Sequence, residues 1–234
     1  MEDMTTTFIT GANKGIGYES ARRLIEAGHT VLIGARDPER GQAAADQLGA
    51  RFVQIDVTDD ASVTAAAADV AAHEGTVDVL INNAGVSGPF PKAEELTAAD
   101  AAEVYGVNVI GIVRVTNTFL PLMKESANPV VVNVSSGMGS FEATKDPDDL
   151  ASSLTAPLYA GSKAAVNMMT TQYATAIPGV KFNAADPGYT STDFTNFEGH
   201  QTVTEGTDAI VELATIGADG PTGEFRNRDG IVGW

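Results

Sequence analysis

The stretch Thr10-Gly11-Ala12-Asn13-Lys14-Gly15-Ile16-Gly17 decides the fold of this chain. It follows a β-branched run at residues 5–10 and opens an amphipathic stretch at residues 15–27. Glycines here allow a sharp turn from strand to helix and a close approach of the backbone to a pyrophosphate, which the free N–H groups of the helix N-terminus would bind. An ordinary glycine-rich turn is the alternative, because the Gly-x-x-x-Gly-x-Gly spacing is not specific by itself.

Short apolar runs and longer alanine-rich stretches alternate along the rest of the chain. The runs are nearly continuous in apolar residues, as in strands that are buried on both faces. Strands are predicted at residues 5–10, 30–35, 51–55, 77–82, 129–135 and 180–184. Helices are predicted at residues 15–27, 38–48, 59–73, 97–123, 158–176 and 204–215. This alternation predicts a doubly wound parallel sheet of the Rossmann type with helices on both faces, and the absence of a linker predicts a single domain over residues 1–234.

The composition restricts the class of protein. The 234 residues include 31 Asp+Glu against 14 Lys+Arg, which gives a formal charge of −17, and 43% of the residues are apolar. That apolar fraction is enough for a substantial core and excludes a disordered chain. The negative charge argues against nucleic-acid binding, because phosphates would be repelled over most of the surface. The absence of cysteine excludes disulfides, thiolate nucleophiles and cysteine-bound metals.

Two further features bear on the location of the protein. No uninterrupted apolar run approaches the ~18 residues that a membrane span needs, so we expect no membrane partner. The start, Met1-Glu2-Asp3-Met4, lacks the basic region and the apolar stretch of a signal peptide. We therefore expect a soluble, cytoplasmic protein.

The end of the second predicted strand, Ala35-Arg36-Asp37, indicates which dinucleotide the loop would bind. In dinucleotide-binding folds an acidic side chain here accepts a hydrogen bond from the ribose hydroxyl of NAD, whereas a basic one pairs with the 2′-phosphate of NADP. Arg36 and Lys14 supply two cations, and a guanidinium can bind phosphate through two hydrogen bonds. Asp37 could bind the NAD ribose or cap the helix that begins at residue 38. We favour the capping role, and therefore NADP(H).

The sequence Tyr159-Ala160-Gly161-Ser162-Lys163 lies at the start of a predicted helix. A spacing of four residues places Tyr159 and Lys163 on one face of that helix. A free phenol titrates at about pH 10 and is a poor acid or base at neutral pH, whereas a neighbouring ammonium would lower its pKa. The motif often arises by chance, and an exposed pair of side chains is the alternative.

Other polar residues follow buried strands. Ser135-Ser136 ends one predicted strand and Asn82-Asn83-Ala84-Gly85 ends another, so both would lie at the carboxyl edge of the sheet, where ligands bind in open α/β folds. Asn108 lies inside a predicted helix, where its propensity is poor. That position indicates either a role in a polar network or a solvated side chain.

Together these residues resemble the short-chain dehydrogenase/reductase family over essentially the full chain. The matching elements, in family order, are the loop at residues 10–17, Asp56, Asn82 to Gly85, Asn108, Ser136, Tyr159 with Lys163, and Pro187-Gly188. Within the family, Asn13-Lys14, Ala35-Arg36-Asp37 and the ending from Gly220 to Trp234 resemble NADPH-dependent carbonyl reductases. The resemblance implies reversible hydride transfer between NADP(H) and a ketone or aldehyde carbonyl.

The resemblance also assigns roles to individual residues. Tyr159 would protonate the carbonyl oxygen as the hydride arrives, and Lys163 would lower the pKa of Tyr159 and bind the nicotinamide ribose. Ser136, rather than Ser135, would orient and polarise the carbonyl. Asn108 would kink its helix and help to hold a water in a proton relay through Lys163. The remaining predicted cofactor contacts are Gly11, Asn13, Lys14, Gly15, Ile16, Gly17, Arg36, Asp56, Val57, Asn83, Ala84, Gly85, Pro187, Gly188 and Thr192.

Two loops depart from the family pattern. The distance along the chain from Ser136 to Tyr159 is longer than is usual in the family, and the extra segment falls within residues 140–157. Monomeric carbonyl reductases have an even longer insertion there, which covers the helices that others use to form oligomers, so we expect a monomer or dimer rather than a tetramer. The insert could also shape the substrate pocket. The segment at residues 190–200 is short for a substrate lid, which predicts a fairly open site.

The sequence disfavours two other classes of function. A Ser/His/Asp hydrolase is disfavoured because the chain has no Gly-x-Ser-x-Gly motif. His29, His73 and His200 show no metal-ligand spacing. A non-catalytic NADP-binding sensor or scaffold with the same fold is the remaining alternative, but such a protein would be expected to lose the Tyr, Lys or Ser of the site, and all three are present. The surplus acid is interpreted as a surface adaptation for solubility or high salt.

Overall fold

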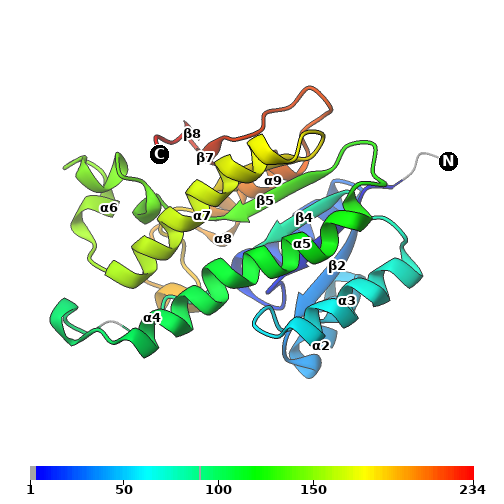
Figure 1. The fold of residues 1–234 in the computed structure, drawn as a ribbon, viewed down its shortest axis with the longest axis horizontal. Coiled ribbons are helices and arrows are strands. Elements are labelled where there is room, and N and C mark those ends of the chain that lie inside the picture. Colours follow the sequence, from blue (N-terminus) through cyan, green and yellow to red (C-terminus); the bar gives the residue numbers. More distant parts are fainter. Residues whose placement is uncertain (1–3, 90) are drawn as a thin grey trace.

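Eight strands of the described residues form one sheet, in the order β3-β2-β1-β4-β5-β6-β7-β8 (Figure 1). The structure is a computed structural model that describes residues 4–89 and 91–234, so residues 1–3 of the segment considered for a signal peptide lie outside it. The strands are β1 (Thr6–Thr10), β2 (Thr30–Ala35), β3 (Arg51–Gln54), β4 (Val79–Asn82), β5 (Val130–Val134), β6 (Lys181–Ala185), β7 (Phe225–Asn227) and β8 (Gly230–Ile231). All neighbouring strands are parallel except β7 and β8. The predicted doubly wound sheet is therefore confirmed.

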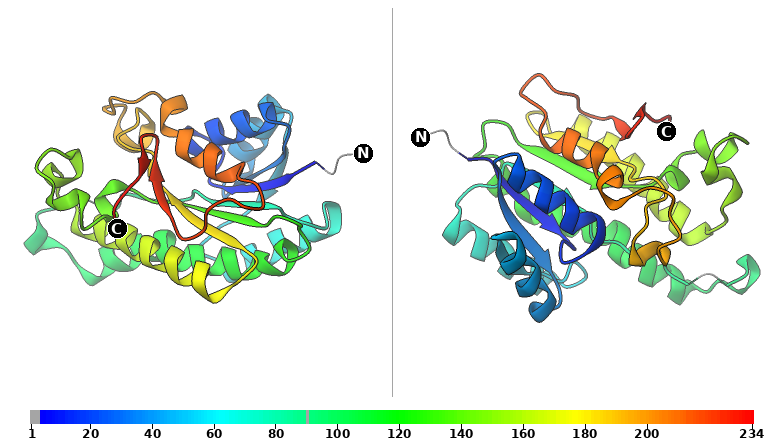
Figure 2. Two further views of the ribbon diagram at one scale, coloured as in Figure 1. Left: turned by 90° about the horizontal axis from the view of Figure 1, so that it is seen from above. Right: turned by 180° about the vertical axis from the view of Figure 1, so that it is seen from behind.

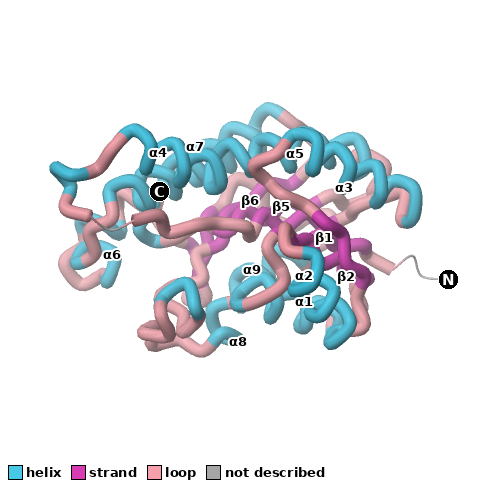
Figure 3. The backbone as a smooth tube through the Cα atoms, turned by 90° about the horizontal axis from the view of Figure 1, so that it is seen from below, coloured by secondary structure: helices cyan, strands magenta, loops and turns pink. Residues whose placement is uncertain are grey.

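Helices cover both faces of this sheet (Figure 3). One face carries α1 (Gly15–Glu26), α2 (Pro38–Leu48), α8 (Val203–Gly206) and α9 (Asp208–Ala214). The other carries α3 (Asp60–His73), α4 (Ala98–Tyr105), α5 (Gly111–Met123) and α7 (Pro157–Ala176). The shorter elements are η1 (Ala93–Glu95), the π-helix η2 (Gly106–Ile110), η3 (Gly137–Gly139), η4 (Ala143–Lys145), α6 (Leu150–Ser153) and η5 (Asp193–Thr195).

Side chains alternate between the two faces of the sheet, as β1 illustrates. Ile9 packs in a buried cluster with Leu24 of α1 and Ile210 of α9. Phe8 faces the opposite layer, where its ring centroid lies 4.6 Å from that of Phe119 in α5. Full burial of a side chain of this size contributes about 1.5–3 kcal/mol. Apolar contacts therefore fix both helical layers to the sheet, and the strand ends are held in place for the site.

Acidic residues precede two of the helices and cap them. Asp37 precedes α2, and its Oδ1 accepts a hydrogen bond of 3.0 Å from the backbone N–H of Arg40. Asp59 precedes α3 and accepts from the N–H of Ala61 at 3.0 Å. The capping role favoured for Asp37 is confirmed, and its carboxylate is thereby committed to the start of α2.

The structure differs from the prediction in β7, β8 and two of the helices, and it contains short elements such as α6 that are not predicted, whereas the bounds of the other predicted strands and helices agree to within two residues. The short strands β7 and β8 are not predicted, because they contain no apolar run. The helix predicted at residues 204–215 is divided at Thr207, which is fully buried, into α8 and α9. The helix predicted at residues 97–123 contains the π-helix η2 between α4 and α5.

The continuous helical segment Ala98–Met123 is long and apolar enough to cross a membrane by length and composition alone. Its 26 residues include an 18-residue window with a mean hydropathy of 1.3. A core helix passes the same test, and here Val115, Phe119 and Met123 are buried against the sheet. The burial of this face accounts for the apolar composition of the helix.

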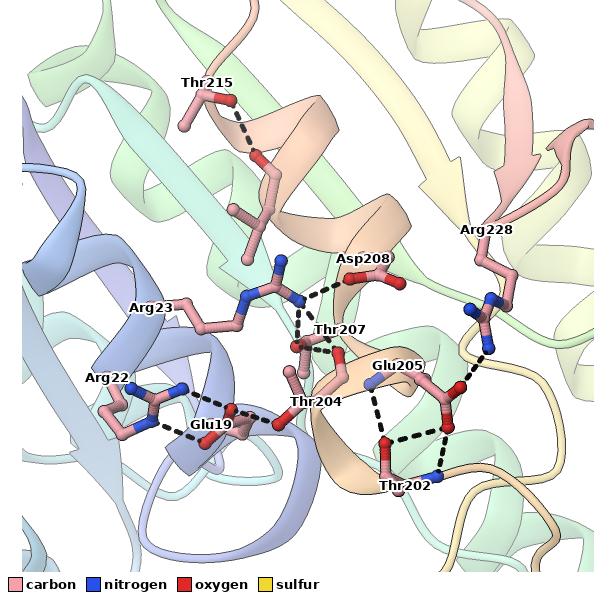
Figure 4. A network of polar contacts seen from close by, with 11 residues as sticks. Glu19, Arg22, Arg23, Thr202, Thr204, Glu205, Thr207, Asp208, Thr215 and Arg228 are labelled. Carbon is pink, nitrogen blue, oxygen red and sulfur yellow. Dashed lines mark hydrogen bonds and ion pairs between the residues drawn. The ribbon is translucent and has the colours of Figure 1, made fainter.

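Polar contacts fasten the C-terminal segment to α1, and we call them the Arg23 clamp. The Nη1 atom of Arg23 donates to Thr204 O, Thr207 Oγ1 and Asp208 Oδ1 at 2.8, 2.8 and 2.7 Å (Figure 4). Arg228 pairs with Glu205 at 2.8 Å and ties the turn between β7 and β8 to α8. Figure 2 shows α8 and α9, in orange, beside α1, in blue. The clamp thus fixes the far end of the segment that follows β6.

Candidate active site

A cavity of about 840 Å³ follows the carboxyl ends of the parallel strands. Its lining comes from the loop after β1 and from the segments that follow β2, β3, β4, β5 and β6. The strand order changes direction between β1 and β4, and open α/β folds bind ligands at such a point. Every residue predicted for the site lines this cavity except Asn108.

The glycine-rich loop forms a close backbone cradle at one end of the cavity. Gly11 adopts a left-handed φ of +65°. A Cβ atom on Gly17 would lie 2.5 Å from Nδ2 of Asn83, so only glycine fits there. Asn83 holds the loop in place, because its Nδ2 donates to the carbonyls of Thr10 and Gly11 at 2.9 and 3.0 Å. No side chain caps the start of α1, so the N–H groups of its first turn face this end of the cavity and suit an anion.

Arg36 and Asp56 lie at the same end of the cavity. Asp56 accepts from the N–H of Thr58 at 2.9 Å and from its hydroxyl at 2.6 Å. Burial acts to raise the pKa of Asp56, but these hydrogen bonds and the charges of Arg36 and Arg114 outweigh it and lower the pKa. Asp56 is therefore a carboxylate at neutral pH, and exposed Arg36 is a cation beside it.

Lys14 has a partner that the sequence does not predict. Its ammonium forms an ion pair with Asp193 of η5, and both residues line the cavity. Asp193 and Thr192 also lie close to Gly15, since a Cβ there would be 3.7 Å from Thr192 Cγ2 and 3.8 Å from Asp193 Oδ1. The segment after β6 therefore lies against the glycine-rich loop, and Lys14 connects the two. Convergence of Lys14 and Arg36 on one phosphate remains a prediction.

The hydroxyls of Tyr159 and Ser136 meet at the other end of the cavity. The side chain of Ser136 hydrogen bonds to the phenol of Tyr159 and also accepts from the N–H of Met138 at 3.2 Å. The hydroxyl of Ser135 is instead buried, and it donates to Asn167 Oδ1 at 2.5 Å. The geometry therefore favours Ser136 over Ser135 as the hydroxyl that faces a ligand.

The electrostatics of Tyr159 differ from the sequence-based expectation. Burial raises the pKa of its phenol, the hydrogen bond from Ser136 opposes this rise, and the charge of Asp186 adds to it. The Nζ atom of Lys163 lies over the tyrosine ring, 5.6 Å from the centroid, and donates to Val134 O at 2.8 Å. Burial lowers the pKa of Lys163 to about 8. Burial therefore outweighs the lowering of the Tyr159 pKa that is expected from Lys163, whose ammonium lies over the ring and bonds to the backbone rather than to the phenol oxygen.

Asn108 lies in the π-helix η2 behind the cavity and is 1% exposed. Its Oδ1 accepts from the N–H of Val86 at 2.8 Å, while Nδ2 donates to Val86 O at 2.9 Å and to Ser162 Oγ at 3.0 Å. The predicted distortion of the helix is thus present. Of the two interpretations left open, the polar network is correct, because the amide joins the loop after β4 to helix α7.

The turn after β6 forms another part of the cavity lining. Pro187, Gly188 and Thr192 line it, and Gly188 has a left-handed φ of +67°. A Cβ atom on Gly188 would lie 2.3 Å from the side-chain oxygen of Gln201, so a larger residue would have to displace that side chain and adopt a strained left-handed backbone. This turn faces the Ser136 side of the cavity, which is where the predicted carboxamide contact would lie.

Comparison with known proteins identifies the family. The sequence pattern described as short chain dehydrogenase matches residues 5–202. The chain belongs to this family. A short-chain dehydrogenase of Penicillium roqueforti is 34% identical to it over 90% of this chain and 88% of that protein. (−)-Isopiperitenone reductase of Mentha piperita is 32% identical over 94% of this chain and 95% of that protein. NADPH-bound carbonyl reductase from chicken fatty liver is 29% identical, covers 99% of each chain and superposes with a TM-score of 0.87.

Several cavity residues of this short-chain dehydrogenase are not predicted from the sequence. Leu150 and Leu154, in and after α6, line the cavity and are each partly exposed. The ring of Phe194 lies 5.9 Å from that of Tyr159. The segment at residues 140–157 therefore contributes to the pocket, as expected. The expectation that it limits oligomer formation stays a prediction. Asp186 also lines the cavity, and a signal was available, because it directly precedes the Pro187-Gly188 turn.

Proposed function

We propose that this short-chain dehydrogenase uses NADPH to reduce a ketone or aldehyde carbonyl to an alcohol, in a reaction that is reversible in principle. One observation carries the proposal: a single cavity joins the glycine-rich cradle and Arg36 at one end to Ser136, Tyr159 and Lys163 at the other. That arrangement supports binding of a dinucleotide along the strand ends with its reactive ring beside the hydroxyl pair. The family membership supports the same class of reaction.

Three residues at the adenosine end support NADP(H) over NAD(H). Ala35 offers no acidic side chain to a ribose hydroxyl, and the carboxylate of Asp37 caps α2. Arg36 is an exposed cation on the cavity lining, which suits a 2′-phosphate. The related carbonyl reductase from chicken fatty liver is described as NADPH-bound.

The side chains at the catalytic end can complete the transfer of a hydride and a proton to a carbonyl. NADPH, when bound, supplies the hydride. Tyr159 stays protonated at neutral pH because burial raises its pKa, so the phenol can donate its proton to the carbonyl oxygen. Ser136 shares that hydrogen-bonded position and would orient the oxygen. Lys163 places positive charge over the tyrosine ring, which would stabilise the phenolate that is left after transfer.

The walls around this end favour an apolar carbonyl compound as substrate. Met138, Leu150, Leu154 and Phe194 present apolar surface to the cavity. The acidic side chains of Asp149 and Asp186 also line the cavity, and Lys163 is a cation that acts on Asp186. An anionic substrate would meet repulsion there, so an uncharged ketone, aldehyde or quinone fits best.

The substitution Tyr159→Phe tests the proposal directly. Removing the hydroxyl should lower kcat for carbonyl reduction by about 10²–10⁴-fold, the usual contribution of a general acid, while NADPH binding measured by fluorescence stays nearly unchanged. Tyr173→Phe is the matched control, because Tyr173 lies on the same helix and its hydroxyl contacts Asn117 outside the cavity. Reduction by Tyr159→Phe at the wild-type rate would remove Tyr159 from the mechanism.

A panel of substrates distinguishes the enzyme from the alternative, a non-catalytic sensor or scaffold. Ketones, aldehydes and quinones are offered with NADPH and with NADH, and the nicotinamide absorbance is followed. Turnover of any of them supports the enzyme and reveals the cofactor preference. Tight NADPH binding with no turnover across the panel would favour the sensor.

A further inference from the structure

Asp186 joins the two turns that form the catalytic end of the cavity. It follows β6 and is partly buried on the cavity lining. Its Oδ1 accepts a hydrogen bond of 2.9 Å from the N–H of Gly188. Its Oδ2 lies against the backbone of Gly137, which supplies a second hydrogen bond, and a Cβ on Gly137 would be only 3.1 Å from that oxygen. One carboxylate therefore connects the turn that carries Ser136 to the Pro187-Gly188 turn.

We propose that Asp186 is a positioning residue of this active site, whose carboxylate fixes Ser136 relative to the Gly188 turn and interacts electrostatically with Lys163 on the same cavity lining. The first half rests on the proposed function, because it concerns the alignment of a carbonyl with the nicotinamide side of the cavity. The second half concerns the charge state of this chain alone.

The charged groups around Asp186 come from three elements. Lys163 and Tyr159 face it from α7, and Asp149 faces it from the start of α6. Burial, helped by the charge of Asp149, raises the pKa of Asp186 above its usual value, and the hydrogen bonds from Gly188 and Gly137 and the charge of Lys163 oppose this rise. Burial lowers the pKa of Lys163 to about 8, and the charge of Asp186 opposes that loss of the proton. Without the carboxylate, Lys163 would lose its proton at a lower pH.

The substitutions Asp186→Asn and Asp186→Ser test the charge. Asparagine keeps one oxygen for Gly188, and serine can form the same local turn through its hydroxyl, so both retain the contact at this turn without the charge. In protein carrying ¹³C-labelled lysine, the resonance of Lys163 is assigned among the six lysines by Lys163→Arg and followed against pH. The midpoint should fall from about 8 by about one pH unit in both variants.

Asp78→Asn is the matched control for the loss of a structural carboxylate. Asp78 accepts from the N–H of Thr6 at 2.7 Å and from Ser126 at 2.5 Å, at the opposite end of the sheet from the site. This variant should lower the melting temperature and leave the Lys163 midpoint unchanged. An unchanged midpoint in folded Asp186→Asn and Asp186→Ser would overturn the proposed role of the charge.

The positioning role is tested in the catalysed reaction. Misalignment of the hydroxyl should lower kcat by on the order of tenfold to a hundredfold in both Asp186 variants, with the KM for NADPH nearly unchanged. The high-pH limb of the reduction profile should also move to lower pH, because Lys163 and Tyr159 both lose their protons more easily without the nearby negative charge. Wild-type kcat in both variants would overturn the positioning role. If the wild-type protein reduces no carbonyl, the proposed function fails, and the lysine titration, which needs neither cofactor nor substrate, still decides the role of the charge.

Discussion

At the scale of single residues, Arg36 is the side chain on which the choice between NADP(H) and NAD(H) depends. Arg36→Ala removes a guanidinium that can bind a 2′-phosphate by charge-assisted hydrogen bonds worth about 1.5–3 kcal/mol. The Kd for NADPH should therefore rise by about 10- to 100-fold, while the Kd for NADH changes by less than about threefold. Both constants are measured by quenching or enhancement of nucleotide fluorescence.

Arg40→Ala provides the control for Arg36. Arg40 is also exposed and lies four residues further along, but it faces Asp37 at 3.6 Å and does not line the cavity. Neither Kd should change in that variant. An equal loss of NADPH and NADH binding in Arg36→Ala would assign Arg36 a structural role.

Residue types and their spacing predict which side chains line this site, but they do not predict its electrostatics. The spacing of Tyr159 and Lys163 follows from helical geometry and is visible in the sequence. The direction of the Tyr159 pKa depends on how deeply the phenol is buried and on whether Lys163 bonds to Val134 O or to the phenol oxygen. Those properties belong to the packed structure, so the spacing of Tyr159 and Lys163 alone could not predict that burial outweighs the ammonium.

At the scale of elements, the contact between η3 and α7 sets the position of the catalytic helix. Gly139 of η3 packs directly on the α7 backbone, and a Cβ there would lie 2.6 Å from the carbonyl carbon of Lys163 and 2.8 Å from the nitrogen of Ala164. Gly139→Ala must therefore displace α7 or η3. Overpacking of this kind costs about 1–3 kcal/mol, so we expect a lower melting temperature together with lower reductase activity.

Gly217→Ala is the comparison for Gly139. A Cβ on Gly217 meets no atom within 4 Å, and the residue needs no left-handed backbone. This variant should match the wild type in thermal denaturation and in activity. Equal melting temperatures of Gly139→Ala and Gly217→Ala would show that η3 and α7 can move apart to accept the methyl group without loss of stability.

Elements with a strong apolar pattern are predictable here, and elements that depend on tertiary contacts are not. The buried strands and the long helices follow from periodicity and from caps such as Asp37. β7 and β8 are held by pairing with neighbouring strands, and the break at Thr207 is held by the Arg23 clamp. The π-helix is stabilised by Asn108, whose mid-helix position signals a network but not its partners Val86 and Ser162.

At the scale of the whole molecule, the formal charge of −17 predicts a stability that depends on salt. Like charges repel one another in the compact state, and the repulsion is screened within about 10 Å at 0.1 M salt. The melting temperature at neutral pH should therefore rise as sodium chloride is added from low concentration. A parallel series with a non-ionic osmolyte distinguishes screening of charge from exclusion of the solute from the protein surface. A melting temperature that is highest without added salt would contradict the prediction.

The ion pair between Lys14 and Asp193 has a consequence for the affinity of this site for a phosphate group. It connects the glycine-rich loop to the segment after β6, whose far end is anchored to α1 by the Arg23 clamp. Both side chains are substantially exposed, so the pair itself adds at most about 1 kcal/mol. A phosphate that takes Lys14 as its partner would leave the Asp193 carboxylate nearby without its cation, and this negative charge would reduce the net gain from the Lys14 contact.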